Sequence, residues 1–223
     1  METQPEPSST NRTPLNRERV VRAAVALADD AGLEALSMRK LGQQLGVEAM
    51  SLYNHVANKD DLLGGMIDVV FSEIDLPVAD VGWRTAMRQR AASVREALAR
   101  HRWATGLMEL RTTHGPASLR HAEAVLDCLR EAGFSIEDAT HASWLLDSYI
   151  YGFAIQEAGL PFGSSEELAE MAEIVLPQLS AAEYPRLNEA AVAGYASGYG
   201  YTDEFEFGLD LILDGLERLR SPI

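Results

Sequence analysis

Residues 37–59 read SMRKLGQQLGVEAMSLYNHVANK, and this stretch decides the fold around it. Ser37 is a favourable N-cap for a helix predicted over 38–45. Gly46 follows directly, where a helix commonly ends in the left-handed conformation. A second short helix is predicted over 49–55, after a turn of only a few residues. Two helices joined in this way are typical of a helix-turn-helix, although an ordinary helical hairpin has the same spacing.

The second of these helices has an outer face suited to DNA. Leu52 is the residue that turns inward, so the neighbouring side chains face outward and carry almost no negative charge. Lys59 follows at the start of the next helix, where a cation suits a phosphate. The exposed residues of this face are Met50, Ser51, Tyr53, Asn54 and His55.

The residues on either side of this stretch divide the chain into three parts. Residues 1–14 are rich in Pro, Ser, Thr and Asn and are predicted to form a disordered tail. Apolar residues recur at steps of three and four over 17–31, which predicts an amphipathic helix before the helix-turn-helix. We therefore expect a three-helix DNA-binding domain over 15–60. A linking helix from Lys59 onward would join it to a larger domain over 61–223.

The rest of the chain is also predicted to be helical, and no stretch shows the sustained alternation of a strand. The glycines and tyrosines of 193–203 indicate a mobile loop. The fold class is therefore all-α. The helices are expected at 59–76, 83–102, 103–110, 116–132, 136–158, 165–176 and 203–220.

Composition limits the class of protein. The 223 residues are 47% hydrophobic and 24% charged, enough apolar surface for a packed core. The longest apolar stretch, 144–155, is interrupted by Asp147 and is too short to span a bilayer, and the N-terminus has no export signal. Cys128 is the single cysteine, so no internal disulfide forms. These features predict a cytosolic protein that does not enter a membrane.

The net charge of −15 argues at first against a nucleic-acid partner, because phosphate-binding surfaces are basic. The charge is unevenly distributed, however. Residues 1–59 hold seven cations and seven anions, whereas the remainder holds twelve cations and twenty-seven anions. The N-terminal module is thus electrically neutral, and the acidic surplus belongs to the second domain.

With its core Leu-Tyr-x-His-Val-x-x-Lys, the run 37–59 closely resembles the DNA-binding signature of the TetR family of one-component transcriptional regulators. The runs EAGFSIEDA (131–139) and FGLDLILDGLE (207–217) resemble its tetracycline-repressor subgroup. The resemblance implies a repressor that binds double-stranded operator DNA and is released by a small-molecule inducer. It implies base contacts by Arg39, Ala49, Met50 and Tyr53, and backbone contacts by Ser51, Tyr53, His55 and Lys59.

Two C-terminal helices are apolar on nearly every side, so they need partners on both sides. They are predicted over 136–158 and 203–220, and they form either the centre of a large core or a subunit interface. In the resembling family these helices pair across a two-fold axis as a four-helix bundle. A homodimer also suits a helix-turn-helix, because two recognition helices about 34 Å apart can read a palindrome.

The resemblance places an inducer site among the helices of 83–132. Aromatic and flexible apolar residues of the kind that line such sites are Met87, Trp103, Leu107, Met108 and Trp144, although each could be plain core. Tetracycline repressors hold a magnesium-drug complex through histidines. Alignment places Met108 at one such position and Ile74 and Asp75 at another. We therefore expect an inducer of another kind, and neither a metal nor another cofactor.

Two other classes of protein compete with the regulator. A helical pocket of this composition could hold a substrate or another apolar ligand, as in an enzyme or a small-molecule-binding protein. The sequence shows no nucleophile motif, phosphate-binding glycine loop, paired carboxylates or metal-ligand spacing, so it favours a protein that is not an enzyme. A helical adaptor acting through its acidic surface would leave Tyr53, His55 and Lys59 without a role.

Overall fold

The computed structural model describes residues 14–108, 114–160, 165–197 and 201–220, and these residues form helices and no strand. None of the helices in these ranges is long and apolar enough to cross a membrane. The helices are α1 (Arg17–Ala31), α2 (Met38–Leu45), α3 (Ala49–Leu52), α4 (Lys59–Ser72), α5 (Trp83–Arg100), α6 (Thr105–Met108), α7 (Pro116–Glu131), α8 (Ile136–Ala158), α9 (Ser165–Val175), α10 (Pro185–Ser197) and α11 (Tyr201–Glu217). The all-α fold is confirmed, and nearly all of the predicted tail lies outside the described residues.

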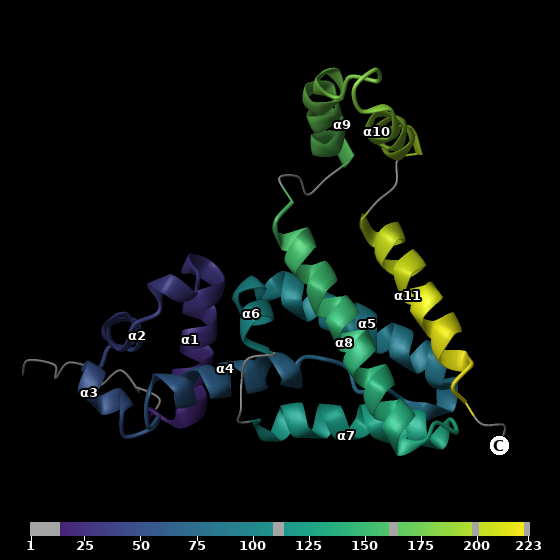
Figure 1. Cartoon of the computed structure of the whole chain (residues 1–223). Coiled ribbons are helices and arrows are strands. Elements are labelled where there is room, and N and C mark those ends of the chain that lie inside the picture. Colours follow the sequence, from purple (N-terminus) through teal and green to yellow (C-terminus); the bar gives the residue numbers. More distant parts are fainter. Residues whose placement is uncertain (1–13, 109–113, 161–164, 198–200, 221–223) are drawn as a thin grey trace, which may run out of the picture.

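The apolar side chains form two separate cores. The first joins α1, α2 and α3 to the beginning of α4 and contains Leu41, Leu52 and Leu62. The second joins the end of α4 to α5, α6, α7, α8 and α11. Figure 1 shows the first group as a small head beside the larger helical body, with α4 running between them. The linking helix thus takes part in both cores.

The recognition helix is shorter than predicted. Regular α-helix covers only Ala49–Leu52, instead of 49–55. The next residues continue as a tighter turn, in which Tyr53 N–H donates to Met50 at 3.2 Å and His55 N–H donates to Leu52 at 2.9 Å. These bonds span three residues and so narrow the last turn, as is common at helix ends.

The prediction of a loop over 193–203 was wrong for most of its length. Helix α10 continues to Ser197, and α11 begins at Tyr201. Residues 198–200 lie outside the described part of the chain. A single Gly194 costs a helix only about 1 kcal/mol, and alanines in α10 favour the helix. Similarly, the described part of the helix predicted over 103–110 is a 3₁₀ turn, Arg102–Ala104, followed by α6, and residues 109 and 110 lie outside the described residues.

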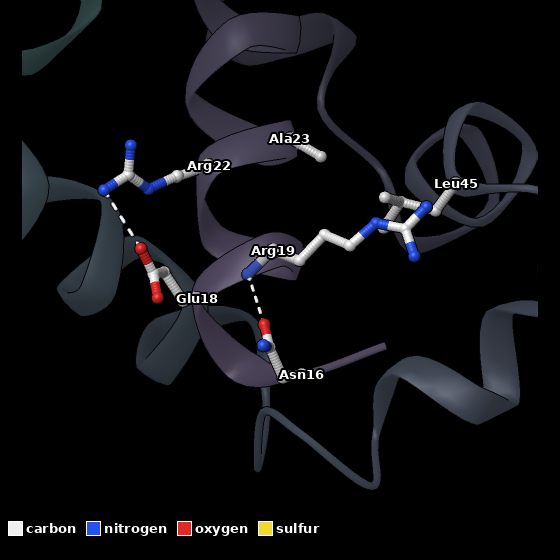
Figure 2. Close-up of a pocket in the computed structure, with 6 residues that line it drawn as sticks. All are labelled: Asn16, Glu18, Arg19, Arg22, Ala23 and Leu45. Carbon is white, nitrogen blue, oxygen red and sulfur yellow. Dashed lines mark hydrogen bonds and ion pairs between the residues drawn. The ribbon is translucent and has the colours of Figure 1, made fainter. Parts of the chain in front are cut away.

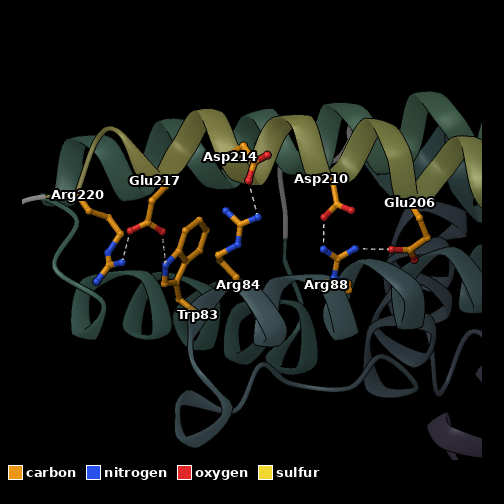
Figure 3. Close-up of polar contacts among 8 residues, drawn as sticks. All are labelled: Trp83, Arg84, Arg88, Glu206, Asp210, Asp214, Glu217 and Arg220. Atoms are coloured by element: carbon orange, nitrogen blue, oxygen red, sulfur yellow. Dashed lines mark hydrogen bonds and ion pairs between the residues drawn. The ribbon is translucent and has the colours of Figure 1, made fainter.

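Ion pairs hold α11 against α5, as Figure 3 shows. Arg84 pairs with Asp214 at 2.6 Å, and Arg88 bridges Glu206, at 2.6 Å, and Asp210. These pairs are largely exposed, so each adds at most about 1 kcal/mol. Together they fix which side of α11 faces the body.

Two glycines shape the turn between α2 and α3. Gly46 has φ +68°, a left-handed conformation that glycine adopts without strain. Gly42 lies inside α2, where an added Cβ would meet Val47 O at 2.8 Å and Ala49 N at 3.1 Å. The absence of a side chain at Gly42 therefore lets the start of α3 pack directly on α2.

We expect Gly42→Val to destabilise the protein by about 1 to 3 kcal/mol, because the new side chain must push backbone atoms apart. Denaturant unfolding measures the change. The control is Gly46→Ala, which meets nothing within 4 Å and adds only backbone strain of about 1 to 2 kcal/mol. If Gly42→Val also keeps full operator affinity, the close approach of α2 and α3 does not position the recognition helix.

Candidate nucleic-acid interface and ligand site

The predicted DNA-contacting side chains lie around α3 and the helix starts beside it. Leu52 is fully buried and anchors the helix, whereas Met50 is 73% exposed and Tyr53 is 44% exposed. Arg39, near the start of α2, Lys59, at the start of α4, and Asn54 are also exposed, and Ala49, Ser51 and His55 are half-buried. The side chains expected to face outward therefore reach solvent, although Ser51 and His55 do so only in part. Their contacts with DNA stay a prediction.

A polar network fixes this face to the rest of the head. Arg17 on α1 forms two hydrogen bonds to the Asp61 carboxylate, at 2.7 and 2.8 Å, and donates to the His55 carbonyl at 3.3 Å. Asp61 also accepts a hydrogen bond from Ala57 N–H at 2.8 Å. The bond to Asp61 raises the pKa of Arg17, despite partial burial. The turn between α3 and α4 is thus held at both ends.

Asn58 caps the start of α4, in an arrangement close to a capping box. Asn58 accepts a hydrogen bond from Asp61 N–H at 2.8 Å. In a full capping box the Asp61 side chain would reach back to the N-cap residue. Here it bonds to Arg17 and Ala57 instead. The carboxylate therefore joins three parts of the head as well as stabilising the helix dipole.

An open groove lies on the head, between the beginning of α1 and the end of α2 (Figure 2). It has a volume of about 490 Å³ and is lined by Asn16, Glu18, Arg19, Arg22, Ala23 and Leu45. Glu18 pairs with Arg22 at 3.0 Å, and Asn16 caps α1. This groove is distant in sequence from every residue predicted to bind the inducer.

The predicted ligand residues do not all come together. Met87 and Met108 are buried in the core of the body, and Leu107 packs against it. Trp103 touches both cores, and its indole N–H donates to Asp29 on α1 at 2.7 Å. Trp144 is 74% exposed on α8. Trp144 therefore does not line an internal site with the methionines of the same chain, because it lies on the opposite side of its helix from buried Ala142 and Leu146.

A histidine joins the head to the body. His101, which is 7% exposed, lies 2.8 Å from Asp29 on α1 and 3.1 Å from Glu73 at the end of α4. Carboxylates only accept hydrogen bonds, so both contacts are hydrogen bonds when the ring is doubly protonated. Burial opposes the charge of Glu73, but hydrogen bonds from His101 and Arg100 outweigh it and lower its pKa. This contact fixes α1 relative to the start of the second core.

The linking helix is also tied to α7. Asp68 on α4 accepts hydrogen bonds from Ala117 N–H at 2.8 Å and Ser118 N–H at 3.0 Å. These amides are at the N-terminus of α7, where a carboxylate is favoured by the helix dipole. A movement of α7 therefore acts directly on α4.

One buried polar cluster was not singled out from the sequence. Arg90 on α5 donates to His121 Nε2 on α7 at 3.2 Å and pairs with Asp147 on α8. Arg90 and His121 are 2% and 3% exposed. Burial, together with the neighbouring Arg90 charge, lowers the pKa of His121 to about 3. The signal in the sequence was Asp147, the single charge in an otherwise apolar stretch of α8.

His121 should make the protein sensitive to acid. The folded protein keeps this ring neutral down to a pH of about 3, whereas the unfolded chain takes up the proton near 6.5. The contribution of His121 to the free energy of unfolding is thus complete above pH 6.5, and it falls by at most about 1.4 kcal/mol per pH unit below that value. Denaturant unfolding at several pH values between 7 and 4.5 measures this slope. We expect a shallower slope in His121→Gln, which keeps an acceptor, and equal slopes would contradict the assignment.

Comparisons with known proteins agree with this architecture. Residues 20–66 match the family model of bacterial regulatory proteins of the tetR family. Residues 76–220 match the model of the tetracyclin repressor-like C-terminal domain. The boundary between the two matches falls near the end of α4, where the second core begins.

Individual relatives are regulators. The chain is 34% identical to the HTH-type transcriptional repressor DrrR1 of Streptomyces coeruleorubidus, over 96% of this chain and 81% of DrrR1. It resembles the structure of ActR from Streptomyces coelicolor in complex with actinorhodin, with a TM-score of 0.80, 29% identity and coverage of 93% and 98%. It also resembles BioQ with its double-stranded DNA operator, with a TM-score of 0.63, 25% identity and coverage of 91% and 98%. The chain belongs to the TetR family of transcriptional regulators.

Proposed function

We propose that this TetR-family protein is a repressor that binds a palindromic operator as a homodimer and is released by a small molecule. The observation that carries the DNA-binding part is the exposed face around buried Leu52, flanked by the exposed cations Arg39 and Lys59. Arg39 and Tyr53 are proposed to contact bases, and Lys59 a phosphate. Met50 and half-buried Ala49 supply apolar contacts, while Ser51, Asn54 and His55 supply polar ones.

The proposed domains follow the two cores. Residues 15–60 form the DNA-binding head and 61–223 form the ligand-binding and dimerisation body. The two family matches, 20–66 and 76–220, support this division, with α4 as the helix that spans it. Leu62 and Met66 of α4 pack in the first core, and Ile67 and Val70 pack in the second.

The homodimer is supported by an apolar surface that a single chain leaves exposed. On α11, Phe207 and Leu211 are each 59% exposed, and on α8, Leu145 and Ile155 are 48% and 57% exposed. Exposed apolar residues gathered on two adjacent helices mark an interaction site. We name these four residues the dimer face. A second copy placed on it would give two heads for the two halves of a palindrome.

The small molecule is proposed to act through α4. A ligand among α5, α7 and α8 changes the position of α7, and Asp68 transmits this change to α4. His101 and Trp103 meanwhile hold α1 to the body through Asp29. The ligand shifts the equilibrium only if it prefers the released state. A preference of about 100-fold supplies nearly 3 kcal/mol per site.

This ligand is proposed to bind without a metal. The resemblance to the tetracycline-repressor subgroup places Met108 at one magnesium-binding histidine position, and Ile74 and Asp75 at the other. Neither position holds a histidine, and Ile74 is buried. In the described part of the chain, no three His, Cys, Asp or Glu residues gather to hold a metal ion. A release response that is lost with EDTA would contradict the proposal.

A gel shift with DNA from upstream of the protein's own gene tests the function against its competitors. A regulator should shift this DNA and not an unrelated fragment of equal length. In a screen of apolar and aromatic compounds, at least one compound should then release the shifted DNA, with and without EDTA. An enzyme or an adaptor would shift neither DNA, and that result would contradict the proposed function.

A further inference from the structure

A buried arginine in the middle of the helical body carries a donor atom that has no hydrogen-bond partner among the described residues. The side chain of Arg90 is 1% exposed. Its Nε donates to His121 Nε2 at 3.2 Å, and its Nη2 donates to Asp147 Oδ1. Within the described ranges of the chain, no group accepts a hydrogen bond from its Nη1.

Stability does not account for an arginine in this place. A guanidinium carries five N–H donors and keeps its charge at any ordinary pH. A buried donor without an acceptor costs free energy, and a buried ion pair is often no more stable than apolar residues of the same volume. A buried polar group left unsatisfied in this way needs an explanation, and a bound ligand supplies one.

The charges around Arg90 favour an anionic acceptor. His121 is neutral, since burial and the Arg90 charge lower its pKa to about 3, and its Nε2 already accepts from Arg90. Asp147 supplies one negative charge, but its side chain is 31% exposed and so partly hydrated. A charged donor forms its strongest hydrogen bonds with a negatively charged oxygen.

The neighbours of Arg90 on the buried side of α5 are apolar. Met87 and Val94 lie about one turn before and one turn after Arg90 on α5, and both are fully buried. Phe71 of α4 packs against the His121 ring, with centroids 5.4 Å apart. A ligand here therefore needs an apolar body with one acidic group, and the His121 ring that Arg90 contacts packs against Phe71 of the linking helix.

We propose that the ligand is an apolar organic acid whose carboxylate or phenolate oxygen accepts a hydrogen bond from Nη1 of Arg90. This inference rests on the proposed function, because it takes the helical body to be the ligand-binding part of a regulator. It adds the chemical class of the ligand and the residue that selects it. Contact with Phe71 would carry the effect of binding to α4.

The test compares acids with neutral derivatives of the same shape. The probes are anthraquinone-2-carboxylic acid with its methyl ester, and 2-hydroxyanthraquinone with its methyl ether. Calorimetry measures their binding to wild type, Arg90→Met and the control Arg84→Met, which removes an exposed arginine of the same helix. In wild type and the control we expect one of the acids to bind at least about tenfold more tightly than its neutral partner, a difference of one charge-assisted bond. In Arg90→Met the two should bind equally, and the pair that shows the preference identifies the acidic group.

A second variant tests whether the buried pair of Arg90 and Asp147 is needed for stability. Arg90→Met combined with Asp147→Leu removes both charges, and we expect its melting temperature without ligand to equal or exceed that of wild type. The proposal is overturned if this variant melts below wild type, if no probe binds to wild type, or if the acid preference survives in Arg90→Met. Gel shifts on the same proteins distinguish a failure of the acidic-ligand proposal from a failure of the proposed function. If neutral compounds release the DNA, the proposal of an acidic ligand is wrong and the proposed function stands. If wild type binds no DNA, the proposed function itself is wrong.

Discussion

Replacing Phe207 and Leu211 together by glutamate should convert the protein to a monomer and weaken operator binding by about 100-fold or more. Both side chains are 59% exposed in the single chain, so the folded monomer tolerates the charges. In the proposed dimer the same charges would lie between two copies of α11, without water or an opposite charge. A monomer offers one head to DNA and loses the gain from binding two half-sites.

Light scattering at micromolar concentration measures this change directly. The control is Leu119→Glu on α7, which places one such charge at a side chain that is 58% exposed, outside the dimer face. We expect the control to stay dimeric and to bind DNA normally. Wild type that is monomeric at this concentration would refute the dimer face.

Replacing Arg39, Tyr53 and Lys59 together by alanine should weaken operator binding by about 100-fold to 10,000-fold, while the protein still folds and dimerises. All three side chains are exposed, so the head loses no core contact. Arg39→Ala alone should cost roughly 1 to 3 kcal/mol and relax the sequence preference. Lys59→Ala alone should weaken binding to all sequences equally and reduce the salt slope by about one unit.

Fluorescence anisotropy at several salt concentrations measures these effects. Arg186→Ala, an exposed arginine on α10 whose side chain is 89% exposed, is the control for a general loss of positive charge. A triple variant that folds and binds the operator as wild type does would show that DNA lies elsewhere on the head.

Local signals in the sequence were sufficient to predict the head. Ser37 and Gly46 mark helix ends through caps that depend only on neighbouring residues, and both act as caps in the structure. Leu52 was predicted to be buried from helical periodicity, and it is. The recognition helix was predicted too long because its last turn changes from α-helical to tighter bonds without any breaker residue.

Tertiary contacts account for what could not be predicted. Arg90, His121 and Asp147 lie on three different helices, and their spacing in the sequence carries no sign that they meet. Trp103 is of a residue type that often lines ligand pockets, but its indole N–H donates to Asp29 in the head. Trp144 is apolar and yet 74% exposed, because α8 turns an apolar side toward solvent in the single chain. Helical periodicity alone does not distinguish a core face from a face that binds a partner.

Selection of DNA from a random duplex pool tests the central claim most directly, because it presumes no operator and no ligand. The purified wild-type protein would capture duplexes through several rounds, and the enriched sequences would be read. We expect a two-fold symmetric sequence whose half-sites lie about one helical turn apart, or a multiple of it, and no enrichment with the Arg39, Tyr53 and Lys59 triple variant. A wild-type protein that enriches no sequence, or only the same sequences as the triple variant, would contradict the account.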